Sequence, residues 1–412
     1  MEQLYHHCAG IDVHKRTAVV TATWIDPDGV RQQATRTFST HTGDLRRLRD
    51  WLTGVAVTHV AMESTGVYWK PVFNVLEAAG ITVVLANARH VKAVPGRKTD
   101  VRDSEWLLDL LQHGLIQGSF IPPADVRALR DLTRHRTNLQ QDRTRAVNRI
   151  HKVLEDANIK LASVVSDVLG VSGRAMLEAL AQGTTDPDVL ADLARGTLRR
   201  KRAELVTALD GLVQAHHRVL LRSLLAQIDH LDGAIGELNA EIAQRLEPFA
   251  AALELLVTIV GIQRRVAEVV IAEIGTDMSR FPSARHLCSW AALCPGNDES
   301  AGKRRSGRIR PGNGWLRTAL VQAAWAATKV KGSSFGALFR RIAARRGPKR
   351  ALIAVAHRLL TVIYSVLSRQ VPYAERGTDY LEEQSSARHA RYHLRRLSEL
   401  GYRVTVEQLP AA

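Results

Sequence analysis

Two aspartates, Asp100 and Asp103, stand three positions apart within the stretch NARHVKAVPGRKTDVRDSEWLLDLLQHG, residues 87–114. Residues at this spacing share one face of a helix. Apolar residues from Trp106 to Leu111 follow at helical period and would bury the opposite face. Like charges at this separation repel, and a hard divalent cation converts the repulsion into binding. The competing interpretation is a pair of solvated acids in a first helical turn, where the helix dipole favours them.

Basic side chains precede the two aspartates, and Pro95-Gly96 keeps that segment a loop before the helix. Side chains of this type beside acidic groups are typical of contacts with phosphates. The alternative is a solvated basic loop. The candidate phosphate contacts are Arg89, His90, Lys92, Arg97, Lys98 and Arg102.

The preceding residues predict the elements that would position such a site. CAGIDVHK, TAVVTATWI and VRQQATRTFS are strand-like, with a DPDG turn at 26–29, and form an antiparallel meander. A helix is expected at 42–53, then a strand THVAME ending at Glu63, a helix closed by Gly80, and a buried strand ITVVLAN. This order is that of an RNase H-like α/β fold, a mixed sheet flanked by helices. The first and fourth strands of that fold are parallel neighbours, so Asp12 and Glu63 are expected to lie together.

Three segments carry a resemblance to a known family. GIDVHK, AMESTGVYWKPV and NARHVKAVPGRKTDVRDSEWLLDLL, in this order, closely resemble the RuvC-like domain of the DEDD transposases of bacterial insertion sequences, the insertion-sequence-one-ten family. The four acidic signature positions of that family fall on Asp12, Glu63, Asp100 and Asp103, and the resemblance implies that they bind Mg²⁺. Oxygen ligands of this kind can hold Mg²⁺ against phosphate oxygens during an in-line attack.

Other side chains near these segments are less specific. His6, His7 and His14 are interpreted as ordinary histidines, because they stand beside hard oxygen ligands. Tyr68 and Trp69 would either stack on a base or pack in the core.

The composition of the whole chain bounds its function. The 412 residues include 57 Lys and Arg against 41 Asp and Glu, a formal net charge of +16. This balance predicts a polyanionic partner, nucleic acid first, and an apolar content of 45% predicts a folded protein. No signal peptide or membrane span is expected, so the predicted location is the cytoplasm. The resemblance implies that this is a bacterial cytoplasm and that the protein associates with the nucleoid. Cys8, Cys288 and Cys294 are odd in number and lack a CxxC pair, which argues against disulfides or a zinc site.

A helical arm is predicted beyond Pro122-Pro123. Its first part is a long basic amphipathic helix, which suits nucleic-acid backbones, helix pairing or a solvated face equally. A second helical stretch, 198–249, carries apolar residues that approximate a coiled-coil seam and ends at Pro248. The two would form an antiparallel arm with a subunit contact. The arginines are Arg127, Arg130, Arg134, Arg136, Arg143, Arg145 and Arg149, and the seam includes Leu220, Leu221, Leu224, Leu225, Ile228, Leu231, Ile235, Leu238 and Ile242.

The segment LELLVTIVGIQRRVAEVVIAEIG, from Leu253, predicts two helices joined at Val260-Gly261-Ile262. It resembles a helix-hairpin-helix, whose turn amides receive a phosphate. Gln263 replaces the second glycine usual there, so a plain helical hairpin is the equal alternative.

A Gly- and Ser-rich basic loop follows between two apolar helices, in the segment FPSARHLCSWAALCPGNDESAGKRRSGRIRPGNGWLRTALVQAAWAA. The glycine spacing excludes a P-loop. The segment resembles the C-terminal domain of the same family, in which the serine of an S-(G/A)-G-K motif is the nucleophile, and that position is Ser300. A serine needs an activating base or metal, and the neighbouring basic side chains could stabilise the phosphorane charge. Ser306 is the fallback nucleophile, and a flexible basic loop is the alternative. The basic residues are Lys303, Arg304, Arg305, Arg308 and Arg310.

These patterns predict four regions: a RuvC-like domain at 1–123, a helical arm at 124–250, a mainly helical C-terminal domain at 251–370 and a polar, loosely held tail at 371–412. The resemblance implies a DNA transposase or site-specific recombinase that forms a phosphoserine at Ser300. It also implies a non-coding bridge RNA that pairs with donor and target DNA, and a dimer of dimers. The alternatives are a RuvC-like endonuclease that hydrolyses branched DNA without a covalent intermediate, and a non-catalytic nucleic-acid-binding protein.

Overall fold

The computed structural model describes residues 3–63, 66–86, 103–295, 298–300, 303–306, 309, 312–375, 377–378 and 391–403. The chain divides into two compact units, Met1–Ile121 and Pro122–Ala412.

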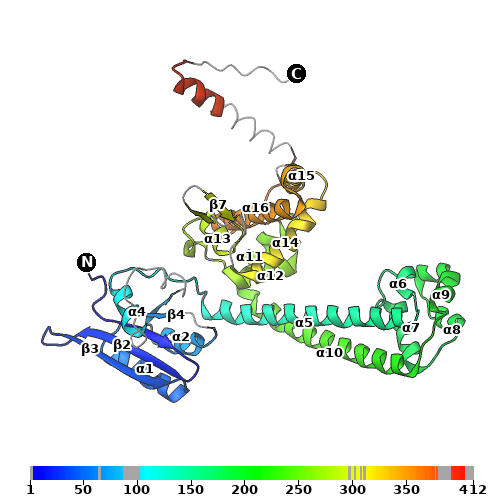
Figure 1. The fold of residues 1–412 in the computed structure, drawn as a ribbon, viewed down its shortest axis with the longest axis horizontal. Coiled ribbons are helices and arrows are strands. Elements are labelled where there is room, and N and C mark those ends of the chain that lie inside the picture. Colours follow the sequence, from blue (N-terminus) through cyan, green and yellow to red (C-terminus); the bar gives the residue numbers. More distant parts are fainter. Residues whose placement is uncertain are drawn as a thin grey trace. The chain divides into compact units, whose positions relative to one another are not determined.

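Unit 1 is an α/β domain built on a five-stranded sheet with the strand order β3-β2-β1-β4-β5 (Figure 1). β1 pairs antiparallel with β2 and parallel with β4, which confirms the predicted meander and the predicted pairing of the first and fourth strands. Its elements are β1 (Cys8–Val13), β2 (Thr17–Ile25), β3 (Arg31–Ser39), α1 (Thr42–Gly54), β4 (His59–Glu63), α2 (Trp69–Glu77), β5 (Thr82–Ala86) and α4 (Asp103–Gln112).

The two faces of this sheet have separate hydrophobic cores, because side chains alternate along each strand. Ile11 and Val13 of β1 pack in one core with apolar side chains of α1 and α2. Cys8 packs in the other with Leu107 and Leu108 of α4. α4 therefore covers one face of the sheet, and α1 and α2 cover the other.

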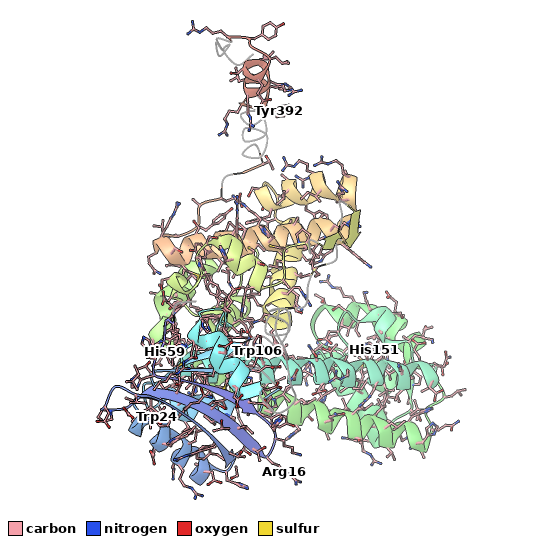
Figure 2. All side chains as sticks on the ribbon, turned by 60° about the vertical axis from the view of Figure 1, so that its left-hand side comes forward. Arg16, Trp24, His59, Trp106, His151 and Tyr392 are labelled. Carbon is pink, nitrogen blue, oxygen red and sulfur yellow. The ribbon has the colours of Figure 1, made fainter. Side chains whose placement is uncertain are left out.

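The aromatic side chains of unit 1 follow the same division. Trp69 packs against the core under α1 and α2, with its ring 5.6 Å from that of Phe73, whereas Tyr68 is exposed. Trp24 and Trp106, both labelled in Figure 2, belong to opposite cores of the sheet. Of the two predicted alternatives, stacking on a base and packing in the core, the structure shows core packing for Trp69.

Unit 2 begins with a long helical arm (Figure 1). Arg143 and Asp232 form an ion pair of 2.5 Å, and Asp156 contacts His217 at 2.8 Å. From the first contact to the second, residue numbers rise along one long helix and fall along the other. The two helices, α5 and α10, therefore run antiparallel. The arm consists of α5 (Ala124–Asp156), α6 (Leu161–Val164), α7 (Val171–Gln182), α8 (Pro187–Ala191), η1 (Gly196–Lys201), α9 (Arg202–Leu209) and α10 (Ala215–Arg245).

The second helical stretch, predicted over 198–249, is interrupted in the structure. It divides into η1, α9 and α10, because the chain leaves the helix after Leu209 and re-enters it at Ala215. Leu220 is 45% exposed, whereas its neighbour Leu221 is buried in a core shared with α7 and α9. The apolar residues of α10 therefore serve a small helical domain at the end of the arm as well as the pairing with α5.

The rest of unit 2 is mainly helical. One described helix, α16, is long and apolar enough to cross a membrane by length and composition alone; half of that apolar window is buried in the protein, as in a core helix. The elements are η2 (Glu247–Phe249), α11 (Ala250–Val257), α12 (Arg264–Ile274), η3 (Met278–Arg280), α13 (Ala284–Trp290), β6 (Asp298–Ser300), β7 (Lys303–Ser306), α14 (Gly314–Lys329), α15 (Ser334–Arg346) and α16 (Pro348–Arg369).

Gly261, in the turn between α11 and α12, has a left-handed φ of 86°. A Cβ atom there would lie 2.5 Å from the carbonyl oxygen of Ala323 on α14. Close packing of the turn on α14 therefore accounts for this glycine, as in a plain helical hairpin.

The first residues of the tail are fixed, contrary to the expectation of a loosely held segment. The backbone N–H of Tyr373 donates to Thr258 Oγ1 at 2.9 Å, and the N–H of Ser334 donates to Glu375 at 3.1 Å. Residues 391–399 form a further helix, on which Tyr392 is exposed (Figure 2).

Candidate functional site

Asp12 and Glu63 lie near the carboxyl ends of two neighbouring parallel strands. The ladder of β1 and β4 pairs Ile11 with Met62. The next residue of each strand is Asp12 and Glu63, and neighbouring strands are about 5 Å apart. The structure thus brings together the two acids that the strand pattern predicted to meet.

α4 lies on the face of the sheet to which both acids belong, and Asp103 is its first residue. Gly10 of β1 touches this helix: a Cβ there would lie 2.0 Å from the carbonyl oxygen of Ser104. The buried hydroxyl of Ser104 is also hydrogen-bonded to Thr21 of β2 at 2.8 Å. These contacts fix the start of α4 against β1, which carries Asp12, and against the neighbouring β2, so a third carboxylate belongs to this face.

The fourth predicted acid, Asp100, lies outside the described residues, and so does every basic residue predicted to contact phosphate in that segment. Asp103 alone of the aspartate pair is therefore placed. The basic residues are Arg89, His90, Lys92, Arg97, Lys98 and Arg102.

His14, which the sequence analysis interpreted as an ordinary histidine, is a neighbour of the site. Its Nε2 lies 3.0 Å from Oδ2 of Asp12. The two residues are separated by one position at the end of β1, and such i and i+2 residues share one face of a strand. That spacing was the available signal, and the imidazole is placed to orient the carboxylate of Asp12.

The three described carboxylates are not tightly clustered. Among the described residues, only Asp156, His216 and His217 have ligand atoms that all lie within 4.8 Å of one another. Asp12, Glu63 and Asp103 are spread more widely than this. Their hard oxygen donors on one face of the sheet nevertheless fit Mg²⁺, which prefers oxygen ligands and retains several waters.

The contact of Asp156 with His217 is explained by helix capping. The N–H of Gln214 donates to Nδ1 of His217 at 3.1 Å. A neutral imidazole that accepts at Nδ1 carries its proton on Nε2, and here Nε2 lies 2.8 Å from Asp156. His217 thus caps α10 and ties it to the end of α5, which accounts for its contact with Asp156 without a metal.

Ser300 lies in a β-hairpin where a loop was predicted. β6 and β7 pair antiparallel, with Ser300 opposite Lys303, so only Ala301 and Gly302 separate the two. The sequence did not predict this hairpin because neither short strand alternates apolar and polar residues. Lys303, Arg304 and Arg305 lie on β7, whereas Arg308 and Arg310 lie outside the described residues.

The ends of the serine hairpin are held together. Pro295 bridges to Ile309. Beyond the hairpin, a Cβ on Gly312 would lie 2.5 Å from Cβ of Ala292 and 3.0 Å from the carbonyl oxygen of Trp290. The segment therefore leaves and re-enters the helical core at one point.

A buried carboxylate links this point to the arm. Glu273 of α12 has no exposed side-chain surface and accepts two hydrogen bonds from Arg134 of α5, at 2.7 and 2.8 Å. Asn313 donates to Glu273 at 2.5 Å and, through Oδ1, caps α14 by accepting from Leu316. Arg130 lies 3.3 Å from the same carboxylate. Glu273 thus joins the root of α5 to the residue that follows the serine hairpin.

A second buried pair lies beside it. Arg136 is 2% exposed and donates to Glu268 of α12 at 2.7 Å. Burial lowers the pKa of Arg130 to about 10 and also lowers the pKa of Arg136, and the facing glutamates oppose both shifts. These arginines hold α5 against α12. The interpretations of a solvated helix face and of free phosphate contacts are therefore wrong for them.

Replacement of Glu273 by alanine is expected to destabilise unit 2. It leaves Arg130 and Arg134 without their carboxylate, and breaking a buried ion pair costs about 3–5 kcal/mol. The measurement is the urea midpoint of the full chain, followed by circular dichroism.

The matched control is Glu237→Ala, which removes an exposed carboxylate from α10. Its urea midpoint should stay at the wild-type value. Equal midpoints for the two variants would show that the Glu273 network contributes nothing to stability.

Two family models match the chain. Residues 9–159 match a transposase model of the DEDD IS110 type, and residues 253–340 match the transposase IS116/IS110/IS902 family. The "Probable family 20 transposase" of Pseudomonas aeruginosa is 25% identical over 336 residues, 79% of this chain and 89% of the relative. The transposase for insertion sequence element IS1111A of Coxiella burnetii is 27% identical over 328 residues, 76% and 79%. The "Pilin gene-inverting protein" of Moraxella bovis is 28% identical over 155 residues, 37% and 46%.

Unit 1 is an α/β unit with acids at its strand ends, and one chain joins it to a mainly helical unit. Together with both family matches, this organisation defines a transposase, an enzyme that acts on DNA. The chain belongs to the IS110 family of transposases.

Proposed function

We propose that this transposase cuts and rejoins DNA through a phosphoserine intermediate at Ser300, with Asp12, Glu63, Asp100 and Asp103 holding Mg²⁺ in an RNase H-like domain. The observation that carries the proposal is the place of Asp12 and Glu63 on parallel neighbouring strands, on the face covered by α4 with Asp103. Further support comes from the family matches, which span these acids and the serine hairpin.

The residues of the chain have distinct tasks in this reaction. Oγ of Ser300 attacks the phosphorus of a DNA phosphodiester and forms the O–P bond, while the bond to one deoxyribose oxygen breaks and that oxygen takes up a proton. Lys303, Arg304 and Arg305, next in the hairpin, supply positive charge for the phosphorane. Magnesium, when bound by the acids, stabilises negative charge on the phosphoryl oxygens. Attack by a deoxyribose hydroxyl on the phosphoserine rejoins the strand and frees the serine.

The proposal includes the partners of the family. A non-coding bridge RNA pairs with donor and target DNA, and the protein acts as a dimer of dimers in the bacterial cytoplasm, at the nucleoid. The net charge of +16 supports a load of nucleic acid. RNA that copurifies with the full chain, expressed with the DNA flanking its gene, tests the guide, and mass photometry of that complex tests the assembly.

A covalent adduct tests the nucleophile. The full chain, incubated with Mg²⁺ and end-labelled DNA of the element's junction, should retain label on a denaturing gel. Ser300→Ala should lose at least about 100-fold of this signal, because the attacking oxygen is absent.

Ser306→Ala is the matched control, since it removes the hydroxyl of the fallback serine on the same hairpin, and it should form adduct normally. If adduct is lost in Ser306→Ala instead, Ser306 is the nucleophile. If Ser300→Ala yields free DNA ends at the wild-type rate, the chain is a hydrolytic endonuclease and the phosphoserine step is wrong.

A further inference from the structure

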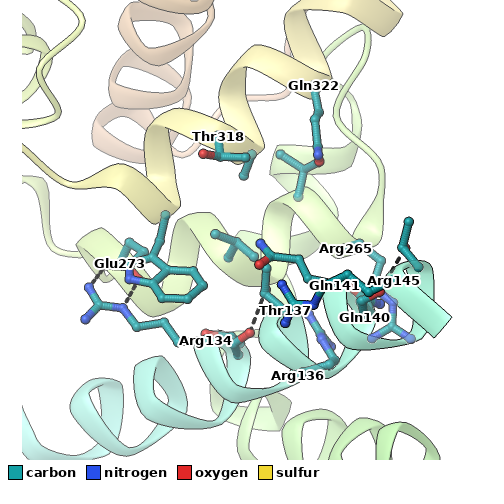
Figure 3. Close-up of a pocket in the computed structure, with 16 residues that line it drawn as sticks. Arg134, Arg136, Thr137, Gln140, Gln141, Arg145, Arg265, Glu273, Thr318 and Gln322 are labelled. Carbon is teal, nitrogen blue, oxygen red and sulfur yellow. Dashed lines mark hydrogen bonds and ion pairs between the residues drawn. The ribbon is translucent and has the colours of Figure 1, made fainter. Parts of the chain in front are cut away.

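A groove of about 430 Å³ lies between α5, α12 and α14, entirely within unit 2 (Figure 3). Its apolar lining includes Val266, Val269 and the ring of Trp315. α5 contributes one polar face, and Thr318 and Gln322 of α14 line the groove from the other side. The volume is that of a site for a small organic group.

The charged side chains at the bottom of the groove are fixed in place. Arg134 is held by both oxygens of Glu273, and Arg136 by Glu268. The guanidinium of Arg134 also lies 5.7 Å from the ring centre of Trp315. A ligand therefore meets side chains that are already ordered, which lowers the entropic cost of binding.

The rim of the groove has hydrogen-bonding capacity that the protein does not use. Among the described residues, no partner lies within hydrogen-bonding distance of the side-chain amides of Gln140, Gln141 and Gln322. All three amides are exposed. Each offers two donors and a carbonyl acceptor.

Positive charge accompanies these amides. The guanidinium groups of Arg145 and Arg265 line the groove and are 60% and 49% exposed. Arg145 pairs with Asp142, and Arg265 donates through Nη1 to Asn239 at 2.6 Å and lies 3.4 Å from Glu268. A guanidinium has five N–H donors, so each arginine keeps donors for a phosphate. Four arginines and the carboxylate of Glu273 line the groove, and the ion-pair partners Glu268 and Asp142 reduce the excess to one positive charge. The groove therefore keeps a net positive charge, which favours an anionic ligand.

We propose that this groove binds an unpaired nucleotide of a DNA or RNA strand, with the base against the glutamine amides and the phosphates at Arg145 and Arg265. Glutamine can make two hydrogen bonds to one base edge, and guanidinium groups bind phosphate. A base enters a concave site only when it is splayed out of its stack, so duplex DNA does not satisfy these amides. The proposal rests on the proposed function only in that the ligand is nucleic acid.

Binding of short oligonucleotides to the full chain tests the site. Single-stranded DNA and RNA of one mixed sequence, and the DNA duplex, are titrated by fluorescence polarisation at low and high salt. The double variant Gln141→Ala/Gln322→Ala should bind single strands about tenfold more weakly and duplex unchanged, because two hydrogen bonds to the base are lost. The loss should be equal at both salt concentrations, whereas the loss for Arg145→Ala should shrink at high salt.

Comparison of the DNA and RNA arms identifies the source of the strand. The controls are Gln227→Ala and Arg222→Ala, which remove an exposed amide and an exposed charge from α10, outside the groove. Thiouridine or thiothymidine in the strand should crosslink to peptides of α14 in the wild type and much less in the double variant.

An equal loss on duplex and single strands, or no loss, overturns the proposal. A changed oligomeric state of the double variant by mass photometry, with strand binding intact, also overturns it and assigns the groove to a second copy of the chain. Neither result affects the adduct at Ser300, which is measured separately.

Discussion

Asp12→Asn is expected to reduce DNA cleavage by at least about 1000-fold while DNA binding persists. The amide has no negative charge and is a poor ligand for Mg²⁺. Metal stabilisation of a phosphoryl transition state is worth several kcal/mol, and each 1.36 kcal/mol is tenfold in rate. The measurement is the initial rate of cleavage of labelled junction DNA with Mg²⁺, beside a binding titration of the same DNA.

Asp109→Asn is the matched control. Asp109 is a carboxylate of the same unit, on α4, but its side chain is 56% exposed, and its variant should cleave normally. Chelation of divalent metal by EDTA should reproduce the Asp12→Asn defect, and added Mg²⁺ should reverse it. Cleavage by Asp12→Asn at the wild-type rate would remove the acidic cluster from the reaction. Unchanged element movement in cells with both Asp12→Asn and Asp100→Asn would favour a non-catalytic binding protein.

The sheet and its two strand-end acids were predictable from local patterns. Alternation of apolar residues defines β1 and β4, and the order of strands in the chain leaves few ways to arrange them. Asp12 and Glu63 then follow as neighbours. Local sequence sufficed because each step depended on the period of a strand or on a short connection.

The roles of the arm arginines were not predictable for a physical reason. Arg136 is buried only because Glu268, 132 residues later, lies opposite, and Arg134 because Glu273 lies 139 residues later. On its own helix each arginine has the pattern of a solvated or phosphate-binding residue. Long-range pairing of charges leaves no periodic signal in a single sequence, and the same holds for the groove between α5, α12 and α14.

The contact of Gly10 with α4 was likewise not predictable, because a glycine within a strand signals a close approach but does not show which element approaches. A substitution at Gly10 is expected to have a large effect because the atoms that face it are backbone atoms. A Cβ at Gly10 would lie 2.0 Å from the carbonyl oxygen of Ser104 and 2.5 Å from the N atom of Leu108. Neither atom can rotate away as a side chain can, so α4 must move as a unit.

Gly10→Ala is therefore expected to loosen α4, with a loss of about 3 kcal/mol in stability, the upper end for overpacking. Amide hydrogen exchange in the full chain should quicken within 103–112, and cleavage should fall because Asp103 shifts relative to Asp12. Gly43→Ala in α1 is the control: a Cβ there meets nothing within 4 Å, and the change should be neutral or stabilising by up to about 1 kcal/mol. Faster exchange in α4 with normal cleavage would separate the packing of this helix from the acid site, and unchanged exchange would contradict the close contact itself. Because Gly10 carries no chemistry, a cleavage defect in this variant reports the packing of α4 on β1, which carries Asp12.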